Sequence, residues 1–494
     1  MIQPIFKGFF LKSFSTSISI GFKFAVSVIL ARSLGKDNFG LWVMVFTVVS
    51  FFWMLADMGI SGSIVKFLPL RIKENSYQDL LKVGFLIKLF LGTVFSIISF
   101  LFADFIAIYV FKRPVLSPYL RIGSGLILVQ SIWTFSVSIF QGKQDWKSEG
   151  IISSAENLVY FLILLFFNFF FALNLINILI LNIIAYLIVA FIAFYLFKKY
   201  FTLQNRNLDS SFVNYITECK TLLKFAIPIF MSNFLFYFLI WTDRTMLGIY
   251  RSNEELSFYF IASNIIIFGR TIFAIIEAVL YPYLAEREVY VAKKKKIIFS
   301  YLFNWFFVST ILGSILVIYV SKPLIMLIYG SEYLESVVAL KYLLAVFIIR
   351  VTSLPITLVL ITLLSKPHIV RNAQFMGLVI GVILNFLLIP KYGYRGAILA
   401  NFAAFSTSFL YNLFYIQKKT YFKIDYFLIF KYLIVFLFFI SLLFIPMNGI
   451  FNFINITISA IILLILYLFK HEFNLIEAKE LLLNNFIMHK LKNK

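Results

Sequence analysis

Apolar runs long enough to cross a lipid bilayer recur along almost the whole chain, and they constrain its fold more than any other feature. A helix needs about 20 mostly apolar residues to span the hydrocarbon core. The chain is 62% hydrophobic and only 13% charged, whereas about a quarter of the residues of a soluble domain are charged. The sequence therefore predicts an all-α integral membrane protein with about 14 transmembrane helices.

The net charge of +22 does not indicate a nucleic-acid partner, because of where the basic residues lie. With the N-terminus in the cytoplasm, most Lys and Arg fall on the predicted inner loops and tails, as the positive-inside rule expects. The run of lysines at 293–296 belongs to this inner set. We therefore expect a multi-pass protein of the cytoplasmic membrane, surrounded by membrane lipids, with both termini in the cytoplasm.

The longest polar stretch between predicted spans divides the chain. The expected parts are an N-terminal six-helix lobe (1–197), a cytoplasmic linker (198–221), a second six-helix lobe (222–417), two additional transmembrane helices (418–470) and a cytoplasmic amphipathic tail (471–494). A faint repeat supports the division, because RSLG at 32–35 and RTMLG at 244–248 close the first span of each lobe. Repeated halves are common in secondary transporters.

Basic residues occur at the depth of the bilayer in several predicted spans. They are Lys23 in span 9–31, Lys88 in span 81–103, Arg270 in span 256–283 and Arg350 in span 338–363. A charge at this depth costs at least about 2.5–3.5 kcal/mol and persists mainly where it faces a wet or polar interior. We predict that these residues line a cationic cavity and bind an anionic substrate. The structural alternative is that they pair with acids and hold helices together.

A polar stripe marks one face of span 9–31. Its members, Lys12, Thr16, Ser19, Lys23 and Ser27, are spaced by three or four residues and so share one helix face. Because a polar stripe facing lipid would be unfavourable, we expect this face to line the cavity. Lys12 lies near the end of the span, where its long side chain can reach the membrane surface.

Other charged residues and prolines have supporting roles in this interpretation. The predicted counter-charges are Asp57, Glu156 and Glu277, any one of which is a candidate carrier of a coupling proton. Residues predicted to be structural or to act in gating are Pro228, Asp243, Arg244 and Pro355. A proline removes a backbone donor and can kink a membrane helix.

The motifs of several catalytic classes are missing from the sequence. There is no P-loop motif, no H-E-x-x-H motif and no cysteine cluster, since Cys219 is the one cysteine. We therefore expect no catalytic residues, no metal site and no cofactor, and a protein that is not an enzyme. A proton or sodium gradient is the candidate energy source.

Motifs in order along the chain resemble those of polysaccharide-biosynthesis flippases. Residues 31–41 (ARSLGKDNFGL) resemble the A-R-x-L-G-x-x-x-F-G-x loop after the first helix of these proteins. The stretch 223–228 (LKFAIP), followed by Asp243-Arg244, resembles the two ends of their seventh helix. Residues 392–397 (YGYRGA) resemble the Y-G-x-x-G-A turn before their twelfth helix, and 329–333 (YGSEY) also fits. The chain thus resembles the Wzx-type O-antigen flippases of the multidrug/oligosaccharidyl-lipid/polysaccharide (MOP) exporter superfamily.

This resemblance implies a MATE-like fold of two six-helix lobes that alternate in access around a cationic lumen. It implies a substrate of undecaprenyl-pyrophosphate-linked oligosaccharide, the repeat unit of O-antigen (the lipopolysaccharide side chain), capsule or exopolysaccharide, moving from the cytoplasmic to the outer leaflet. Expected partners include the polysaccharide polymerase and the chain-length machinery.

Four alternative functions stay open at this point. The nearest is lipid II flipping for peptidoglycan, and the next is a multidrug/cation antiporter of the same superfamily, which would require an acidic, aromatic pocket. A membrane polymerase or ligase and a purely structural protein are the others.

Overall fold

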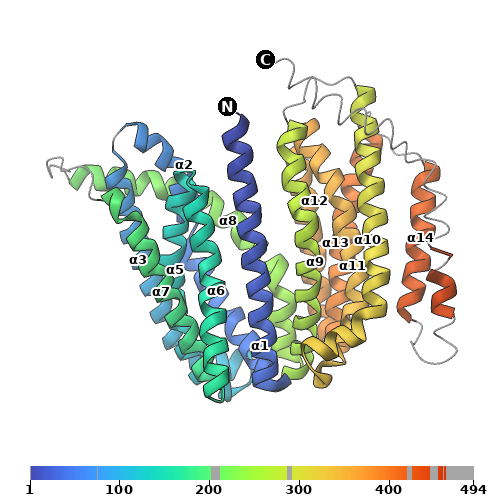
Figure 1. Cartoon of the computed structure of the whole chain (residues 1–494), viewed down its shortest axis with the longest axis horizontal. Helices are drawn as coiled ribbons and strands as arrows, with labels where there is room; N and C mark the ends of the chain where they lie inside the picture. The colour runs from blue at the N-terminus through green and yellow to red at the C-terminus, as the bar shows by residue number, and fades with distance from the viewer. Residues whose placement is uncertain are drawn as a thin grey trace. The chain divides into compact units, whose positions relative to one another are not determined.

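The computed structural model describes residues 2–74, 76–201, 212–285, 292–419, 426–444, 454–459 and 461–462, and it contains no β-strand within these ranges (Figure 1). The long helices are α1 (Ile2–Asp57), α2 (Ile60–Lys73), α3 (Tyr77–Leu101), α5 (Ser117–Gly142), α6 (Trp146–Phe170), α7 (Leu175–Phe201), α8 (Phe212–Tyr250), α9 (Asn253–Ala285), α10 (Ala292–Ile328), α11 (Ser336–Leu358), α12 (Pro367–Tyr392), α13 (Tyr394–Lys419) and α14 (Tyr426–Phe444). Short elements are α4 (Ala103–Phe105), the π-helices η1 (Ile106–Val110) and η4 (Val359–Leu363), and the 3-10 helices η2 (Pro114–Leu116) and η3 (Ser331–Tyr333).

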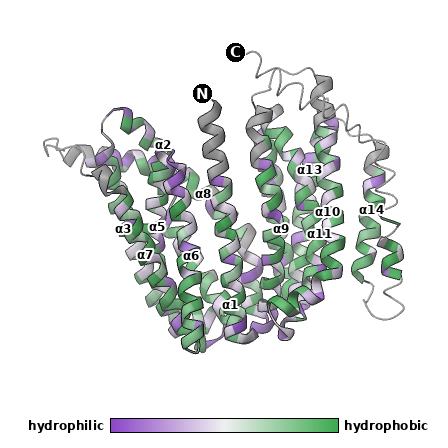
Figure 2. Ribbon diagram, in the orientation of Figure 1, coloured by the Kyte–Doolittle hydropathy of each residue, from purple (hydrophilic) through white to green (hydrophobic). Residues whose placement is uncertain are grey.

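The helices have the length and composition of membrane spans. Within the described ranges, 10 helical segments are long and apolar enough to cross a bilayer, and Figure 2 shows apolar residues along their whole lengths. The predicted spans 9–31 and 41–63 lie largely within α1, whose helical conformation is interrupted at Gly35 (φ 69°, ψ 168°). The prediction of an all-α, multi-pass membrane protein is confirmed. Most of the predicted last span, 449–469, lies outside the described residues.

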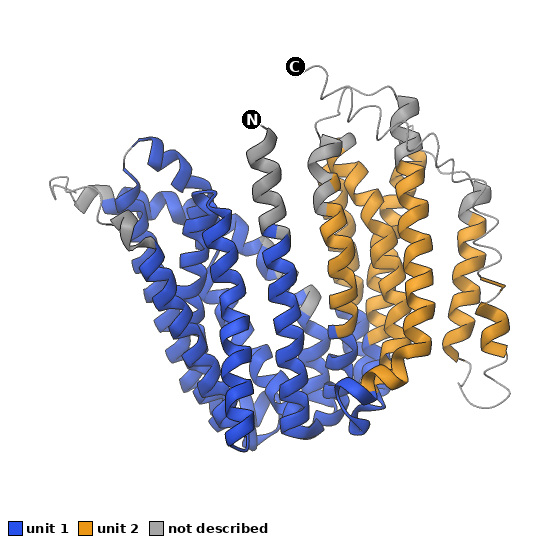
Figure 3. Cartoon of the chain, in the orientation of Figure 1, with its two compact units in different colours: residues 1–264, 326–335, 382–397 blue, residues 265–325, 336–381, 398–494 orange. Residues whose placement is uncertain are grey.

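The chain forms two compact units (Figure 3). Unit 1 consists of residues 1–264, 326–335 and 382–397, and unit 2 consists of residues 265–325, 336–381 and 398–494. In the predicted linker, α7 continues to Phe201 and α8 starts at Phe212. The predicted tail 471–494 lies outside the described residues. The division into two six-helix lobes with an appended helix pair stays a prediction.

Polar contacts explain why two distant segments belong to unit 1. Arg32 of α1 donates from Nε to the carbonyl oxygen of Ile328, at 2.7 Å, and Tyr333 donates its hydroxyl to the carbonyl oxygen of Ala31, at 2.8 Å. At the turn between α12 and α13, Glu255 accepts a hydrogen bond from the backbone N–H of Tyr394, at 2.7 Å. Each bond satisfies backbone groups that a helix end leaves unpaired.

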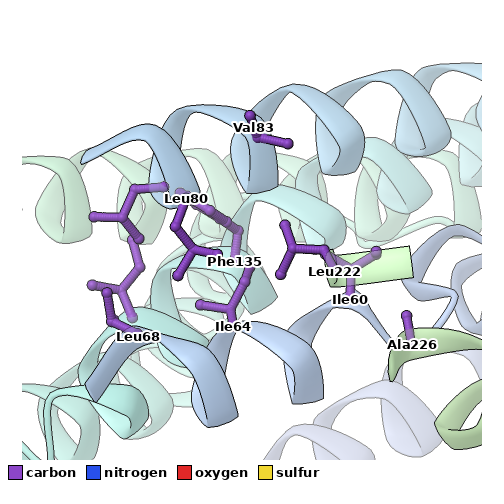
Figure 4. Packing of buried hydrophobic residues seen from close by; sticks show 10 residues of the cluster. Ile60, Ile64, Leu68, Leu80, Val83, Phe135, Leu222 and Ala226 are labelled. Atoms are coloured by element: carbon purple, nitrogen blue, oxygen red, sulfur yellow. The ribbon is translucent and has the colours of Figure 1, made fainter. Parts of the chain in front are cut away.

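The inner packing of unit 1 is illustrated by an apolar cluster between α2, α3, α5 and α8 (Figure 4). Its buried members are Ile60, Ile64, Leu68, Leu80, Leu81, Val83, Phe135, Ile139, Leu222 and Ala226. Close van der Waals fit holds the cluster together, and small residues such as Ala226 allow the helices to approach.

Candidate functional site

Lys88 is buried inside unit 1 with its charge satisfied. Its side chain is 0% exposed, and its Nζ donates to the carboxylate of Asp57 and to the hydroxyl of Thr134, the latter at 3.1 Å. The flanking glycines permit this burial, because a Cβ at Gly84 would lie 3.1 Å from Ile64 and a Cβ at Gly92 would lie 3.0 Å from Ser131. In this conformation Lys88 cannot contact a substrate unless the ion pair opens.

Asp57 occupies the break between α1 and α2. Met58 and Gly59 have positive φ angles of 46° and 78° there. The carboxylate of Asp57 accepts hydrogen bonds from the backbone N–H of Gly59, at 3.2 Å, and from the hydroxyl of Ser61, at 2.5 Å. Asp57 therefore links the first turn of α2 to Lys88 of α3. This is the position expected for a counter-charge.

The polar stripe of α1 contacts protein at several of its members. Lys12 forms an ion pair with the fully buried carboxylate of Glu149 on α6. Ser19 donates to the carbonyl oxygen of Ser153, at 3.1 Å, and accepts from Asn157, at 2.9 Å. These members of the stripe therefore hold α1 against α6, and the expectation that the stripe lines a cavity stays a prediction. Polar side chains within a bilayer form hydrogen bonds across helices, which satisfies groups that lipid cannot.

The stripe members Ser27 and Lys23 make different contacts from Ser19. The hydroxyls of Ser27 and Tyr329 lie 3.3 Å apart, in a buried contact. Lys23 is exposed, and within the described part of the chain its interactions are electrostatic, with Glu156 and Arg244. Glu156, of α6, is itself buried.

Glu156 belongs to a buried polar network between α5, α6 and α7. Its carboxylate interacts with the hydroxyl of Tyr186, which accepts a hydrogen bond from the side-chain nitrogen of Gln130, at 3.3 Å. Tyr160, also buried, donates to the carbonyl oxygen of Ile178, at 3.2 Å. Glu156 also interacts electrostatically with Lys23.

Asp243 and Arg244, near the end of α8, are buried rather than surface residues. The guanidinium of Arg244 lies 4.6 Å from the ring centre of Trp241 and 5.0 Å from that of Phe260. Asp243 accepts hydrogen bonds from the hydroxyl of Tyr259 and from the backbone N–H of Arg244. The Nε of Arg244 has no hydrogen-bond partner among the described residues.

In unit 2, α9 carries Arg270 and Glu277, both partly buried. The two side chains interact electrostatically. No salt bridge joins them within the described ranges, which agrees with their separation along the helix. The Nε of Arg270 is buried and has no hydrogen-bond partner there.

The remaining predicted residues of the site lie in α8 and α11. Arg350 lies over the ring of Phe405 of α13, with 4.3 Å between the guanidinium and the ring centre. Pro355 is buried in α11, one turn before the π-helix η4, as expected for a residue that disturbs the helical hydrogen bonds. Pro228 is exposed, and α8 continues through it.

The sequence analysis did not identify several residues that contact the α1 stripe or Lys88. Glu149, Ser153 and Asn157 of α6 are separated by four residues each and share a helix face. This stripe is complementary to that of α1, so matching polar stripes between predicted spans would have found it. Nothing local marks Thr134 as a partner of Lys88. No cluster of potential metal ligands occurs among the residues that the structure describes.

Comparisons with solved structures identify the fold. "Lipid II flippase MurJ, inward closed conformation" is 18% identical, with a TM-score of 0.63 over 94% of this chain and 99% of that chain. A multidrug resistance MATE family transporter of the MOP superfamily, outward-facing, is 13% identical, with a TM-score of 0.54 over 84% and 95%. A MOP superfamily transporter from Pyrococcus furiosus, whose title reports a binding pocket of reverse polarity, is 13% identical, with a TM-score of 0.55 over 83% and 96%.

Sequence comparison adds the family. No protein with a curated description matches the chain. The family model described as "Polysaccharide biosynthesis protein" matches residues 5–288, more than half of the 494 residues. The solved structures confirm the expected MATE-like fold, and the family model confirms the resemblance to polysaccharide-biosynthesis proteins. The chain belongs to the polysaccharide biosynthesis protein family.

Proposed function

We propose that the protein is a flippase for undecaprenyl-pyrophosphate-linked oligosaccharide. It moves the repeat unit of O-antigen, capsule or exopolysaccharide from the cytoplasmic to the outer leaflet of the bacterial inner membrane, by alternating access. The observation that carries this proposal is Lys23, an exposed cation in the middle of a membrane helix of a polysaccharide biosynthesis protein. A charge at that depth requires a polar environment or a charged ligand.

The chemistry of the deep cations suits a pyrophosphate or an acidic sugar. Lys23, Arg270 and Arg350 each place a positive charge within a membrane helix. Arg can contact a phosphate with two parallel hydrogen bonds, whereas Lys acts as a point charge. Lys88 joins them only in a conformation that separates it from Asp57. The acyl chain of the substrate stays in the lipid.

Glu156, Glu277 and Asp57 balance these cations in the absence of substrate. Glu156 is the strongest candidate for a coupling proton, because it is buried and interacts electrostatically with the exposed Lys23. A proton or sodium gradient supplies the energy, no cofactor takes part, and no bond of the substrate is broken. Both termini lie in the cytoplasm, where synthesis of the substrate ends, and the polymerase and chain-length machinery receive the product outside.

The test is flipping of a fluorescent undecaprenyl-pyrophosphate glycan in proteoliposomes. We compare wild type with Lys23→Ala, Arg270→Ala and the control Lys147→Ala, which alters an exposed lysine in the first turn of α6. Flipping by wild type and by the control, with a sharp loss in the first two variants, supports the proposal. Well-folded wild type that flips no glycan, with or without an ion gradient, would overturn it.

Lipid II is the second candidate substrate, since the fold comparison that covers 94% of the chain is with a lipid II flippase. Both lipids carry a pyrophosphate, so the deep cations do not separate them. Competition in the same proteoliposomes does: lipid II that blocks glycan flipping at equal concentration favours a shared or lipid II substrate. A cationic drug is disfavoured as the substrate, because the exposed deep charge of unit 1 is basic.

A further inference from the structure

Helix α11 of unit 2 is irregular over one stretch, which begins at Pro355 and continues through the π-helix η4. Proline has no backbone N–H, so residue 355 cannot donate to the carbonyl oxygen of Val351, four residues before it. After η4 the N–H of Leu364 donates to the carbonyl oxygen of Val359, five residues before it, at 3.0 Å. Helices kink at prolines and at π-turns. α11 therefore has two weak points close together.

Side-chain hydroxyls weaken the same stretch further. Three threonines donate their hydroxyls to the backbone carbonyl of the residue four before, at 2.7–3.0 Å, and they are Thr352, Thr357 and Thr362. Bonds of this kind compete with the backbone N–H groups and often bend helices. Seven of the twelve residues 351–362 are β-branched, which lowers the helix propensity. The sequence here favours a helix that bends easily.

The helix α13 supports α11 on both sides of this stretch. Before it, the guanidinium of Arg350 lies 4.3 Å from the ring centre of Phe405. After it, the side chain of Lys366 donates to the hydroxyl of Tyr415, at 2.9 Å. α13 is one helix without a proline. Both contacts are made by long, flexible side chains, so they can adjust when the backbone between them bends.

We propose that residues 351–364 form a hinge about which α11 bends as the protein alternates in access. This inference rests on the proposed function, since hinges are the residues that absorb the backbone change in such a cycle. It gives Pro355, predicted from the sequence to be structural or to act in gating, a definite role, which is to keep the helix bendable. Arg350 lies five residues before Pro355, so bending moves this cation relative to the far end of α11.

The first experiment measures the distance between spin labels on the two sides of the hinge. The labels are attached at Lys341→Cys and His368→Cys of the full chain in lipid, in a Cys219→Ser background. We expect a broad distance distribution with Pro355 and a narrower one with Pro355→Ala, because alanine restores the missing donor and favours the helix. An equally narrow distribution with Pro355 overturns the inference, whatever the transport activity.

The control is Pro323→Ala, which changes a proline inside α10 that the 3-10 helix η3, rather than a π-helix, follows. It should leave the distance distribution and glycan flipping unchanged. A narrowing in this control as large as that in Pro355→Ala overturns the inference, because the effect would not belong to α11.

Stability and flipping together separate a hinge from a proline with a structural role only. Pro355→Ala should raise the thermal unfolding temperature and yet slow glycan flipping by about tenfold. Thr357→Val removes one hydroxyl bond and should slow flipping less, whereas Thr357→Ser keeps the bond and should flip normally. If Pro355→Ala does not fold, the two Thr357 variants decide.

The outcomes also separate this inference from the proposed function. Flipping that is unchanged in Pro355→Ala and in Thr357→Val overturns the inference and leaves the proposed function standing. Well-folded wild type that flips no glycan, but shows the broad distance distribution, overturns the proposed function and leaves the hinge standing.

Discussion

Lys88 and Lys23 both lie in membrane helices of unit 1, yet their surroundings are opposite. Lys88 is fully buried and is bonded to Asp57 and Thr134. Lys23 is exposed and, within the described residues, interacts with Glu156 and Arg244 only through space. The comparison teaches that depth in the membrane does not by itself assign a role to a charge. The partner does, because a cation neutralised by a neighbouring acid holds helices together, whereas an unpaired one is available to a ligand.

The largest expected effect comes from breaking the Lys88 pair. Lys88→Met leaves the carboxylate of Asp57 without its cation, and removal of one partner of a buried ion pair costs about 3–5 kcal/mol. We expect a large fall in the thermal unfolding temperature of the purified protein. The double variant Asp57→Asn/Lys88→Met should recover much of the loss, because no charge is left unpaired. Equal losses in the single and double variants would show that the pair is not the source of stability.

Two glycines test whether the backbone is more tightly packed near the Lys88–Asp57 pair than near Lys23. Gly59 follows Asp57 with a φ of 78°, and a Cβ there would lie 2.4 Å from the carbonyl oxygen of Ala226. Gly59→Ala should therefore destabilise the protein by about 2 kcal/mol. Gly21, two residues before Lys23, has nothing within 4 Å of its Cβ. Gly21→Ala should raise helix stability by about 0.5–1 kcal/mol.

Thermal unfolding of both alanine variants measures this difference. A similar change in unfolding temperature in the two variants would contradict the prediction. It would mean that the break between α1 and α2, which places Asp57, is no more constrained than the open face around Gly21.

The sequence predicted the parts of this arrangement that depend on local pattern. Length and apolarity are properties of single segments, so the all-α membrane fold followed from them, and Lys23 and Lys88 stood out by depth alone. Their difference depends on contacts between distant helices. Asp57 reaches Lys88 because α1 breaks at Met58, and Thr134 arrives from α5, which no spacing within α3 could indicate. The contacts of the α1 stripe have the same origin, since the matching stripe lies on α6.

Chemical labelling tests the exposure that separates the two lysine sites. Cys219 is the chain's one cysteine, so a Cys219→Ser background allows single cysteines to be followed. Lys23→Cys should react with a small water-soluble thiol reagent about tenfold faster, or more, than Ser131→Cys, because exposure controls thiol reactivity. Ser131 is 0% exposed beside Gly92 of the Lys88 helix and changes little in size on substitution. Comparable rates would remove the distinction between an open and a closed site.

The smallest expected effect is a shift in the pKa of Lys143, which follows α5 outside the membrane span. This lysine tests the effect of burial on a cation. Burial lowers the pKa of Lys143 to about 8, and the nearby charge of Asp145 opposes this shift. An unfolded chain keeps the lysine proton up to about pH 10.4. Between these values the unfolded state binds more protons, so the contribution of Lys143 to stability rises with pH across this window.

The rate of Lys143 acylation against pH, followed by mass spectrometry, should have its midpoint near 8, since the neutral amine is the reactive form. Asp145→Asn should move the midpoint lower, because the opposing charge is gone. Asparagine can still accept the hydrogen bond from the backbone N–H of Ser148 that Asp145 accepts at the start of α6, so the helix end is preserved. A midpoint near the ordinary lysine value would mean that burial at this turn does not disfavour a cation. In that case burial alone would be a poor reason for the close pairing of Lys88.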